Sequence, residues 1–172
     1  MSTPRFGTWF DTVQRKNHYV DLITRLYLPD HKESKEHKYV TINPGDRDPA
    51  YKVTENFSVH ELVCKCGCGY FFFNDHFLYT ALQPFRTKIG RPLSIRSGCR
   101  CPEHNTASGG SPTSDHLSLF GVDIVTNNGL ERFEIITNII PFFDRLGVAN
   151  SFIHVGSSSQ RPNVGSQVQW KY

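Results

Sequence analysis

Three residues in the second half of the chain, His116, Asp123 and His154, have side chains that could form a mononuclear zinc site. They lie in the segments SDHLSLFGVDIV and SFIHV. Two imidazole nitrogens and one carboxylate oxygen can occupy three corners of a Zn²⁺ tetrahedron and leave the fourth for water, and this open corner distinguishes a catalytic zinc site from a structural one. If the three side chains share one ion, the protein is expected to be a hydrolase or the descendant of one.

The elements predicted around these residues can bring them together. FGVDIV and SFIHV are each typical of a strand, and His116 lies in a loop after the flexible GGSPTSD. Because side chains alternate along a strand, Asp123 and His154 should both point away from the face that carries their apolar neighbours. Adjacent strands could then present the two side chains together, with His116 reaching in from its loop. A histidine that only forms hydrogen bonds remains the alternative, because the chain has 8 histidines.

The rest of the second half predicts an α+β fold. Helices are expected in NFSVHEL, in DHFLYTALQPFRTKI between Asn74 and Gly90 with a bend at Pro84, in PEHNTAS, and in LERFEIITNIIPFFDRL up to Gly147. Further strands are expected in PLSIRS and QVQWKY. Helices and strands alternate without a regular repeat, and some connections are short enough for antiparallel pairing. The expected architecture is a small, mainly antiparallel sheet packed with helices.

Length and charge limit the classes of protein that fit. A chain of 172 residues suits one domain of ordinary size with an appended segment. The formal net charge of +3 is scattered along the sequence, so a nucleic-acid partner is not expected. No stretch approaches the roughly 20 apolar residues that span a bilayer, and the opening lacks the pattern of a signal peptide. The protein is therefore expected to be made in the cytoplasm.

The composition changes near residue 55 and predicts two parts. Residues 1–55 form an expected N-terminal appendage, and residues 56–172 form the main domain. The appendage should contain an amphipathic helix from Trp9 to Leu28, the charged run KESKEHK, a short strand from Tyr39 to Ile42 and the turn-rich INPGDRDPAY. It could dock on a larger assembly such as a virion or cover a flank of the domain, and both interpretations stay open.

Five cysteines form two tight clusters, CKCGC and GCRC; they are Cys64, Cys66, Cys68, Cys99 and Cys101. The odd number leaves at least one thiol outside any intramolecular disulfide. Cys-x-Cys spacing is at least as consistent with metal binding or free thiols as with bridges. A second, structural metal, one disulfide between the clusters, and reduced thiols are the three alternatives.

The run SIRSGCRCPEHNTASGGSPTSDHLSLFGVDIV resembles the zinc D-alanyl-D-alanine carboxypeptidase family, cell-wall peptidases with a hedgehog-type α+β fold. The family reads SGYRcpeHN, then a glycine-rich loop, then SxHxxGxAxD, and finally a strand with a histidine, often FxHxD. The resemblance extends from about residue 56 to the C-terminus. It implies that His116, Asp123 and His154 are the zinc ligands, that Ser114 is the serine of SxHxxGxAxD, and that Arg100 is the arginine of SGYR.

The activity implied by this resemblance is zinc-assisted hydrolysis of amide bonds in bacterial peptidoglycan, in its stem peptides or cross-bridges. Zinc would polarise the scissile carbonyl and lower the pKa of its water towards ~7. Arg100 would contact the substrate and stabilise the oxyanion, and Ser114 would also line the substrate site. Such an enzyme, taken as phage-encoded, would act on the cell wall after release or as part of a phage particle.

The sequence departs from the family where a general base is expected. Members of the family carry an acidic base three residues before the last histidine ligand, or Asp two residues after it. Ser151 and Gly156 occupy these positions here. General acid–base help is typically worth about 10²- to 10⁴-fold in rate, so its loss would reduce turnover and leave metal binding largely intact. Asp115 and His104 are the alternative bases.

Three more departures lie near the predicted ligands. Leu119 replaces a glycine of the family, Gly121 replaces an alanine, and Cys99 replaces the tyrosine of SGYR. Since glycine at such a site often adopts φ > 0, which leucine resists, Leu119 predicts a different backbone path between His116 and Asp123.

Three functions follow from this sequence. The first is a zinc peptidase that acts on peptidoglycan. The second is a catalytically degenerate relative that serves as a structural or binding component of a virion. The missing general base is the observation that motivates this hypothesis. The third is a non-enzymatic signalling-type domain of the hedgehog fold, which the intact motif around Arg100 disfavours.

Overall fold

The computed structural model of the chain describes residues 39–41, 52–158, 161, 165 and 168–172. The predicted helix from Trp9 to Leu28 and the run KESKEHK lie outside the described residues. The predicted strand from Tyr39 to Ile42 is present as β1 (Tyr39–Thr41), which pairs antiparallel with β2 (Tyr70–Phe72). Division of the chain at residue 55 and the role of the first 55 residues stay predictions.

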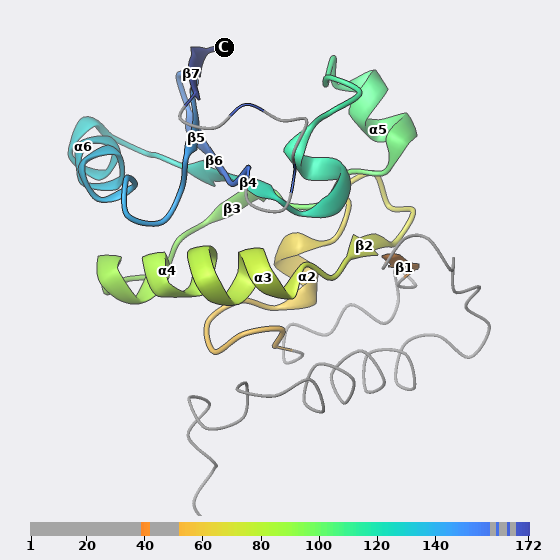
Figure 1. Cartoon of the computed structure of the whole chain (residues 1–172), viewed down its shortest axis with the longest axis horizontal. Helices are drawn as coiled ribbons and strands as arrows, with labels where there is room; N and C mark the ends of the chain where they lie inside the picture. Colours follow the sequence, from red (N-terminus) through yellow and green to blue (C-terminus); the bar gives the residue numbers. More distant parts are fainter. Residues whose placement is uncertain (1–38, 42–51, 159–160, 162–164, 166–167) are drawn as a thin grey trace, which may run out of the picture.

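The main sheet has five strands in the order β3-β4-β6-β5-β7. The strands are β3 (Ile95–Ser97), β4 (Gly121–Val125), β5 (Arg145–Val148), β6 (Phe152–Gly156) and β7 (Val168–Lys171). All neighbours pair antiparallel except β5 and β7, which are parallel. The predicted class, an α+β fold with a mainly antiparallel sheet and packed helices, is confirmed (Figure 1).

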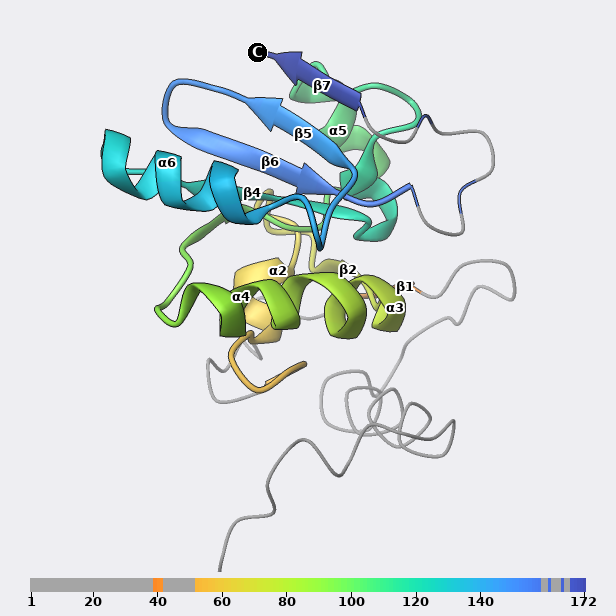
Figure 2. The same cartoon turned by 60° about the vertical axis from the view of Figure 1, so that its left-hand side comes forward.

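Short helices surround this sheet, and Figures 1 and 2 show the α3–α4 rod lying along one side of it. The helical segments are α2 (Val59–Leu62), α3 (Asp75–Phe77), η3 (Leu78–Leu82), α4 (Gln83–Ile89), α5 (Pro102–Ala107), η4 (Asp115–Ser118) and α6 (Gly129–Asn138). The predicted capping pair at α2 is present, since the Ser58 N–H donates to the Glu61 carboxylate at 2.8 Å. None of the helices in the described part of the chain is long and apolar enough to cross a membrane.

The core lies between the α3–α4 rod and the apolar face of the sheet. Val122, Ile124, Ile153 and Val155 of β4 and β6 are fully buried on that face. The side chains packed around them include a group of phenylalanines from the rod and the segment after α6, and two of these rings, Phe85 and Phe143, meet edge to face with centroids 5.2 Å apart. Burial of this face directs the alternate residues of β4 and β6 to the opposite side.

The rod around Pro84 differs from a simple bent helix. Asn74 begins it by accepting a hydrogen bond from the Phe77 N–H at 3.1 Å. Residues 78–82 then form a π-helical turn, in which the Gln83 N–H donates to the Leu78 carbonyl. The wider turn places Pro84 in the first turn of α4, where a missing N–H costs little. The rod ends at Gly90, whose φ of 73° is left-handed.

The prediction of one helix from Leu130 to Leu146 is wrong in its second half. The helix α6 ends at Asn138, and Gly147 lies inside strand β5 instead of closing a helix. Pro141 explains the early end, because proline disfavours the helical conformation of the residue before it and cannot donate a helical hydrogen bond. The residues after it are then free to pair with both β6 and β7.

Candidate metal centre

One row of paired residues crosses all five strands of the sheet. Ser97 pairs with Asp123, Asp123 with His154, His154 with Gly147, and Gly147 with Trp170. The neighbours of Asp123 and His154 along β4 and β6 belong to the core on the other face. The alternation expected from the sequence therefore holds, and the two polar side chains lie side by side.

The turn η4 carries His116 to this row. The Ser114 hydroxyl accepts a hydrogen bond from the His116 N–H at 3.3 Å, so Ser114 caps the turn. The Nδ1 atom of His116 lies 2.7 Å from the Gly98 carbonyl. Ligand atoms of His116, Asp123 and His154 all lie within 4.8 Å of one another, and each residue is 2% exposed. The structure thus brings the three predicted ligands together.

The buried Nε2 atom of His116 fits a metal ion. The ring must donate from Nδ1 to the Gly98 carbonyl, because a carbonyl can only accept. Its Nε2 then carries a lone pair and has no hydrogen-bond partner, although the Asp123 Oδ1 atom is 3.3 Å away. A lone pair that faces a carboxylate oxygen in a buried site is unfavourable. A cation between the two atoms would remove this conflict.

His154 lies between two carboxylates. Its Nδ1 atom is 2.8 Å from Asp123 Oδ1, and its Nε2 atom is 3.0 Å from Asp115 Oδ2. With Nε2–H donating to Asp115, Nδ1 is oriented as a metal ligand, the arrangement in which a carboxylate fixes a ligating histidine. Sequence reasoning considered Asp115 only as a base and missed this role, which depends on a contact between η4 and β6.

Arg100 holds the third candidate ligand, Asp123, in place by a hydrogen bond. Its Nη2 atom donates to Asp123 Oδ2 at 2.7 Å, and its Nε atom donates to the Ser97 hydroxyl at 2.9 Å. Burial alone would raise the pKa of Asp123, but the adjacent imidazole rings of His116 and His154 hold it well below its usual range. Arg100 therefore positions the carboxylate, and its expected contact with substrate stays a prediction.

Neither alternative base has the properties of one. Asp115 accepts from Arg145 Nε at 2.9 Å and also from Arg161. Burial would raise the pKa of Asp115, but His154 and the two guanidinium groups lower it to about 2, so this carboxylate holds a proton poorly. His104 is engaged elsewhere, because its Nδ1 atom lies 3.2 Å from the sulfur of Cys64.

Gly121 and Gly156, two positions at which the chain departs from the family, leave space for the side chain of Asp115. A Cβ atom at Gly156 would lie 2.4 Å from Asp115 Oδ2, and one at Gly121 would lie 2.9 Å from Asp115 Cβ and 2.8 Å from His154 Nε2. Any side chain at these positions would displace the carboxylate or the ligand. The carboxylate of Asp115 thus lies in the space that an aspartate at position 156 would enter.

The expectation that leucine at position 119 would resist the left-handed conformation is wrong, because Leu119 adopts it with φ of 48°. Its N–H donates to the Asp115 carbonyl at the end of η4, and its side chain is fully buried. Hydrophobic burial therefore outweighs the backbone strain, which is about 1–2 kcal/mol for a residue with a Cβ.

At position 119 a glycine variant should be more stable than an alanine variant, the reverse of the usual order. Glycine removes the buried side chain, which costs about 2–5 kcal/mol, but relieves the strain. Alanine removes nearly as much and keeps the strain. We expect Leu119→Gly to lower the free energy of unfolding by about 1–3 kcal/mol and Leu119→Ala to lower it further. Urea unfolding measures both, and an alanine variant more stable than the glycine variant would contradict the account.

The stability of the metal-free protein should fall at alkaline pH. Burial lowers the pKa of His154, but Asp115 and Asp123 outweigh burial and raise it above 6.5. A raised folded-state pKa stabilises the folded chain fully below the unfolded value, and the contribution is lost as pH rises through the folded pKa. A metal ion bound at Nδ1 would replace that proton. Urea unfolding above pH 7 should therefore show falling stability with a chelator and little change with zinc.

The aromatic side chain of Trp170 in β7 lies beside the centre. The ring of Trp170 lies 5.3 Å from that of His154, and the guanidinium of Arg145 lies 5.4 Å from the Trp170 ring. Gly147 permits this approach, because a Cβ there would lie 2.7 Å from the Trp170 ring. Trp170 also lines a cavity of about 830 Å³ between α6 and β7. None of the three candidate ligands lines this cavity.

Two histidines and one aspartate at the junction of a loop and a sheet form the type of ligand set that mononuclear metal-dependent hydrolases use. Residues 55–156, more than half of the chain, match the sequence model of the family described as Peptidase M15. The chain therefore belongs to the Peptidase M15 family, and the resemblance to zinc D-alanyl-D-alanine carboxypeptidases is confirmed at the level of the family. Comparison with curated proteins gave no match.

Proposed function

We propose that the protein is a zinc-dependent peptidase that cleaves amide bonds in peptidoglycan stem peptides or cross-bridges. One observation carries the proposal: His116, Asp123 and His154 converge within 4.8 Å in a Peptidase M15 chain, and the buried His116 Nε2 atom lacks a partner. The proposal extends to a phage-encoded enzyme that reaches the bacterial wall after release or as part of a phage particle.

Each residue of the centre has a distinct task in this proposal. His116 Nε2, an oxygen of Asp123 and His154 Nδ1 would hold the ion, which supplies Lewis-acid polarisation of a peptide carbonyl and acidification of water. Arg100 holds the Oδ2 atom of Asp123. Its guanidinium would also lie beside the reacting carbonyl and stabilise the charge that develops there. Asp115 keeps the proton of His154 on Nε2, so that Nδ1 remains available.

A specific observation favours a second candidate, a catalytically degenerate relative that binds metal and serves as a structural or binding component of a virion. Ser151 and Gly156 cannot act as carboxylate bases, and Asp115 is committed to His154, Arg145 and Arg161. Metal binding without turnover is the expected behaviour of such a protein.

The test compares zinc content and cleavage in matched variants. Zinc-loaded protein should release amino groups from purified peptidoglycan, and His116→Ala should abolish this release together with one equivalent of bound zinc. His60→Ala is the matched control, because His60 is exposed on α2 and should leave both readouts unchanged. Zinc binding that depends on His116 without any cleavage would favour the second candidate. Cleavage that survives His116→Ala would overturn the peptidase proposal.

A further inference from the structure

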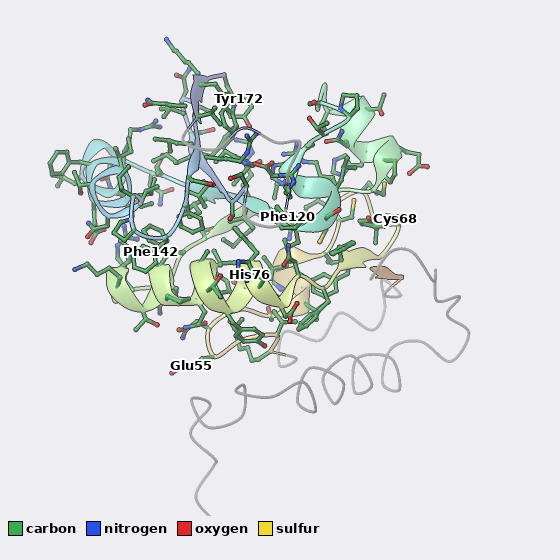
Figure 3. The ribbon with its side chains drawn as sticks, viewed as in Figure 1. Glu55, Cys68, His76, Phe120, Phe142 and Tyr172 are labelled. Carbon is green, nitrogen blue, oxygen red and sulfur yellow. The ribbon has the colours of Figure 1, made fainter. Side chains whose placement is uncertain are left out.

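A second group of metal-ligand side chains lies away from the histidine centre. The sulfur atoms of Cys64, Cys66, Cys68 and Cys101 all lie within 4.8 Å of one another. Figure 3 shows yellow sulfur atoms beside the labelled Cys68, between the chain before β2 and the helix α5. The fifth cysteine, Cys99, is separate from them, since its sulfur accepts a hydrogen bond from the Phe72 N–H at 3.2 Å.

The spacing of the sulfur atoms matches a tetrahedral metal site. The Cys64 and Cys66 sulfurs are 3.4 Å apart, and those of Cys66 and Cys101 are 3.8 Å apart. A zinc–sulfur bond of about 2.3 Å gives a tetrahedron whose edges are about 3.8 Å. A disulfide requires about 2.05 Å between sulfurs, and all five cysteines are free thiols in the structure.

The backbone brings alternate cysteines of CKCGC to one point. Gly67 and Gly69 have left-handed φ values of 97° and 79°, which residues with a Cβ rarely adopt. The chain therefore turns after Cys66 and again after Cys68. In an extended strand, side chains two residues apart share a face but are too far apart to meet at one point. Cys101 approaches from the start of α5.

Hydrogen-bond donors surround three of the four sulfurs. The Cys101 N–H points to Cys64 at 3.4 Å, the Tyr70 N–H to Cys68 at 3.3 Å, and the His104 N–H to Cys101 at 3.4 Å. Donors of this kind stabilise the anionic sulfur, and the thiolate is the form that binds metal. The Nδ1 atom of His104 also lies 3.2 Å from the Cys64 sulfur.

We propose that Cys64, Cys66, Cys68 and Cys101 bind a structural zinc ion that joins the chain before β2 to the start of α5. Four thiolates complete the tetrahedron, so this site has no open corner for water. Each ligand thiol gives up its proton to solvent as the ion binds. Because Cys101 directly follows Arg100, the ion also fixes the segment that braces Asp123. The proposal does not depend on peptidase activity.

Metal content tests the proposal. Protein purified under reducing conditions should contain two zinc equivalents, and Cys66→Ser and Cys68→Ser should each contain one. Both residues are exposed, so the variants should fold. Cys99→Ser is the matched control and should keep two equivalents, because Cys99 lies outside the group of four sulfurs and its own sulfur accepts a hydrogen bond from the Phe72 N–H. His116→Ala should retain the equivalent that depends on Cys66.

Cobalt substitution identifies the ligands. Four thiolates around Co²⁺ give intense sulfur-to-metal charge-transfer absorption, which a site of two histidines and one carboxylate lacks. This band should persist in His116→Ala and disappear in Cys66→Ser, so failure of the thiol site is distinguishable from failure of the histidine site. The proposal is overturned if Cys66→Ser retains the band and all its zinc, or if mass spectrometry finds a disulfide between these cysteines in the metal-binding protein.

Discussion

Replacement of Asp115 by alanine should weaken zinc binding by about 10- to 100-fold and destabilise the fold by about 3–5 kcal/mol. The first effect follows because His154 loses the acceptor that keeps its proton on Nε2. The second follows because Arg145 and Arg161 would lose their shared, 3% exposed partner. Both guanidinium groups are partly solvated, which places the loss toward the lower end of the range. Chelator competition measures the affinity, and urea unfolding measures the stability.

A carboxylate introduced at position 156 provides the matched control for this prediction. Gly156→Asp alone should be harmful, because its Cβ would lie 2.4 Å from Asp115 Oδ2. Combined with Asp115→Ala, the same substitution returns a carboxylate to this space from β6 and should recover part of the lost zinc affinity. A double variant that binds zinc more weakly than both single variants would contradict the view that one carboxylate stands in for the other.

Replacement of Arg100 by methionine should lower kcat/KM for peptide cleavage by about 10²- to 10³-fold, the usual cost of losing one donor to a developing oxyanion. Methionine keeps much of the apolar stem but leaves Asp123 Oδ2 without its 2.7 Å partner. Arg96→Met is the control, because Arg96 lies in β3, shortly before Arg100, but its guanidinium donates to the Ser151 hydroxyl at 2.8 Å.

Measuring kcat and zinc affinity separately distinguishes two roles of Arg100. If the guanidinium stabilises the reacting carbonyl, kcat falls while zinc affinity stays within about tenfold of the parent. If it only orients Asp123, zinc affinity falls and saturating zinc restores kcat. Arg100→Lys keeps the charge without the fork that reaches both Asp123 and Ser97, so it should rescue the first role better than the second.

The part of the site that lies on strands could be predicted from the sequence, because alternation depends only on local geometry. Asp123 and His154 occupy paired positions on β4 and β6, as their apolar neighbours indicated. The surroundings of Asp115 could not be predicted, since Arg145 and Arg161 are 30 and 46 residues away in sequence. Their approach depends on how β5 and the chain after β6 fold over η4.

Two local signals gave wrong predictions because other features of the chain opposed them. The helical periodicity of residues 130–146 extends past Pro141, but this proline ends the helix, and the last two residues of the segment, Arg145 and Leu146, pair with β6 and β7. Leu119 adopts a backbone conformation that its residue type disfavours, because burial offsets the strain. The spacing of the cysteines left three alternatives, and only their convergence in space favours metal over a bridge.

The paired row that crosses the sheet also links metal binding to the correctness of folding. A slip of β6 by one residue against β4 would turn His154 into the apolar core and place Ile153 or Val155 opposite Asp123. A misaligned chain would therefore lose a ligand and the hydrophobic packing in one step. Bound zinc would select the native register from its near competitors, so zinc occupancy can report the fraction of correctly folded molecules in a preparation.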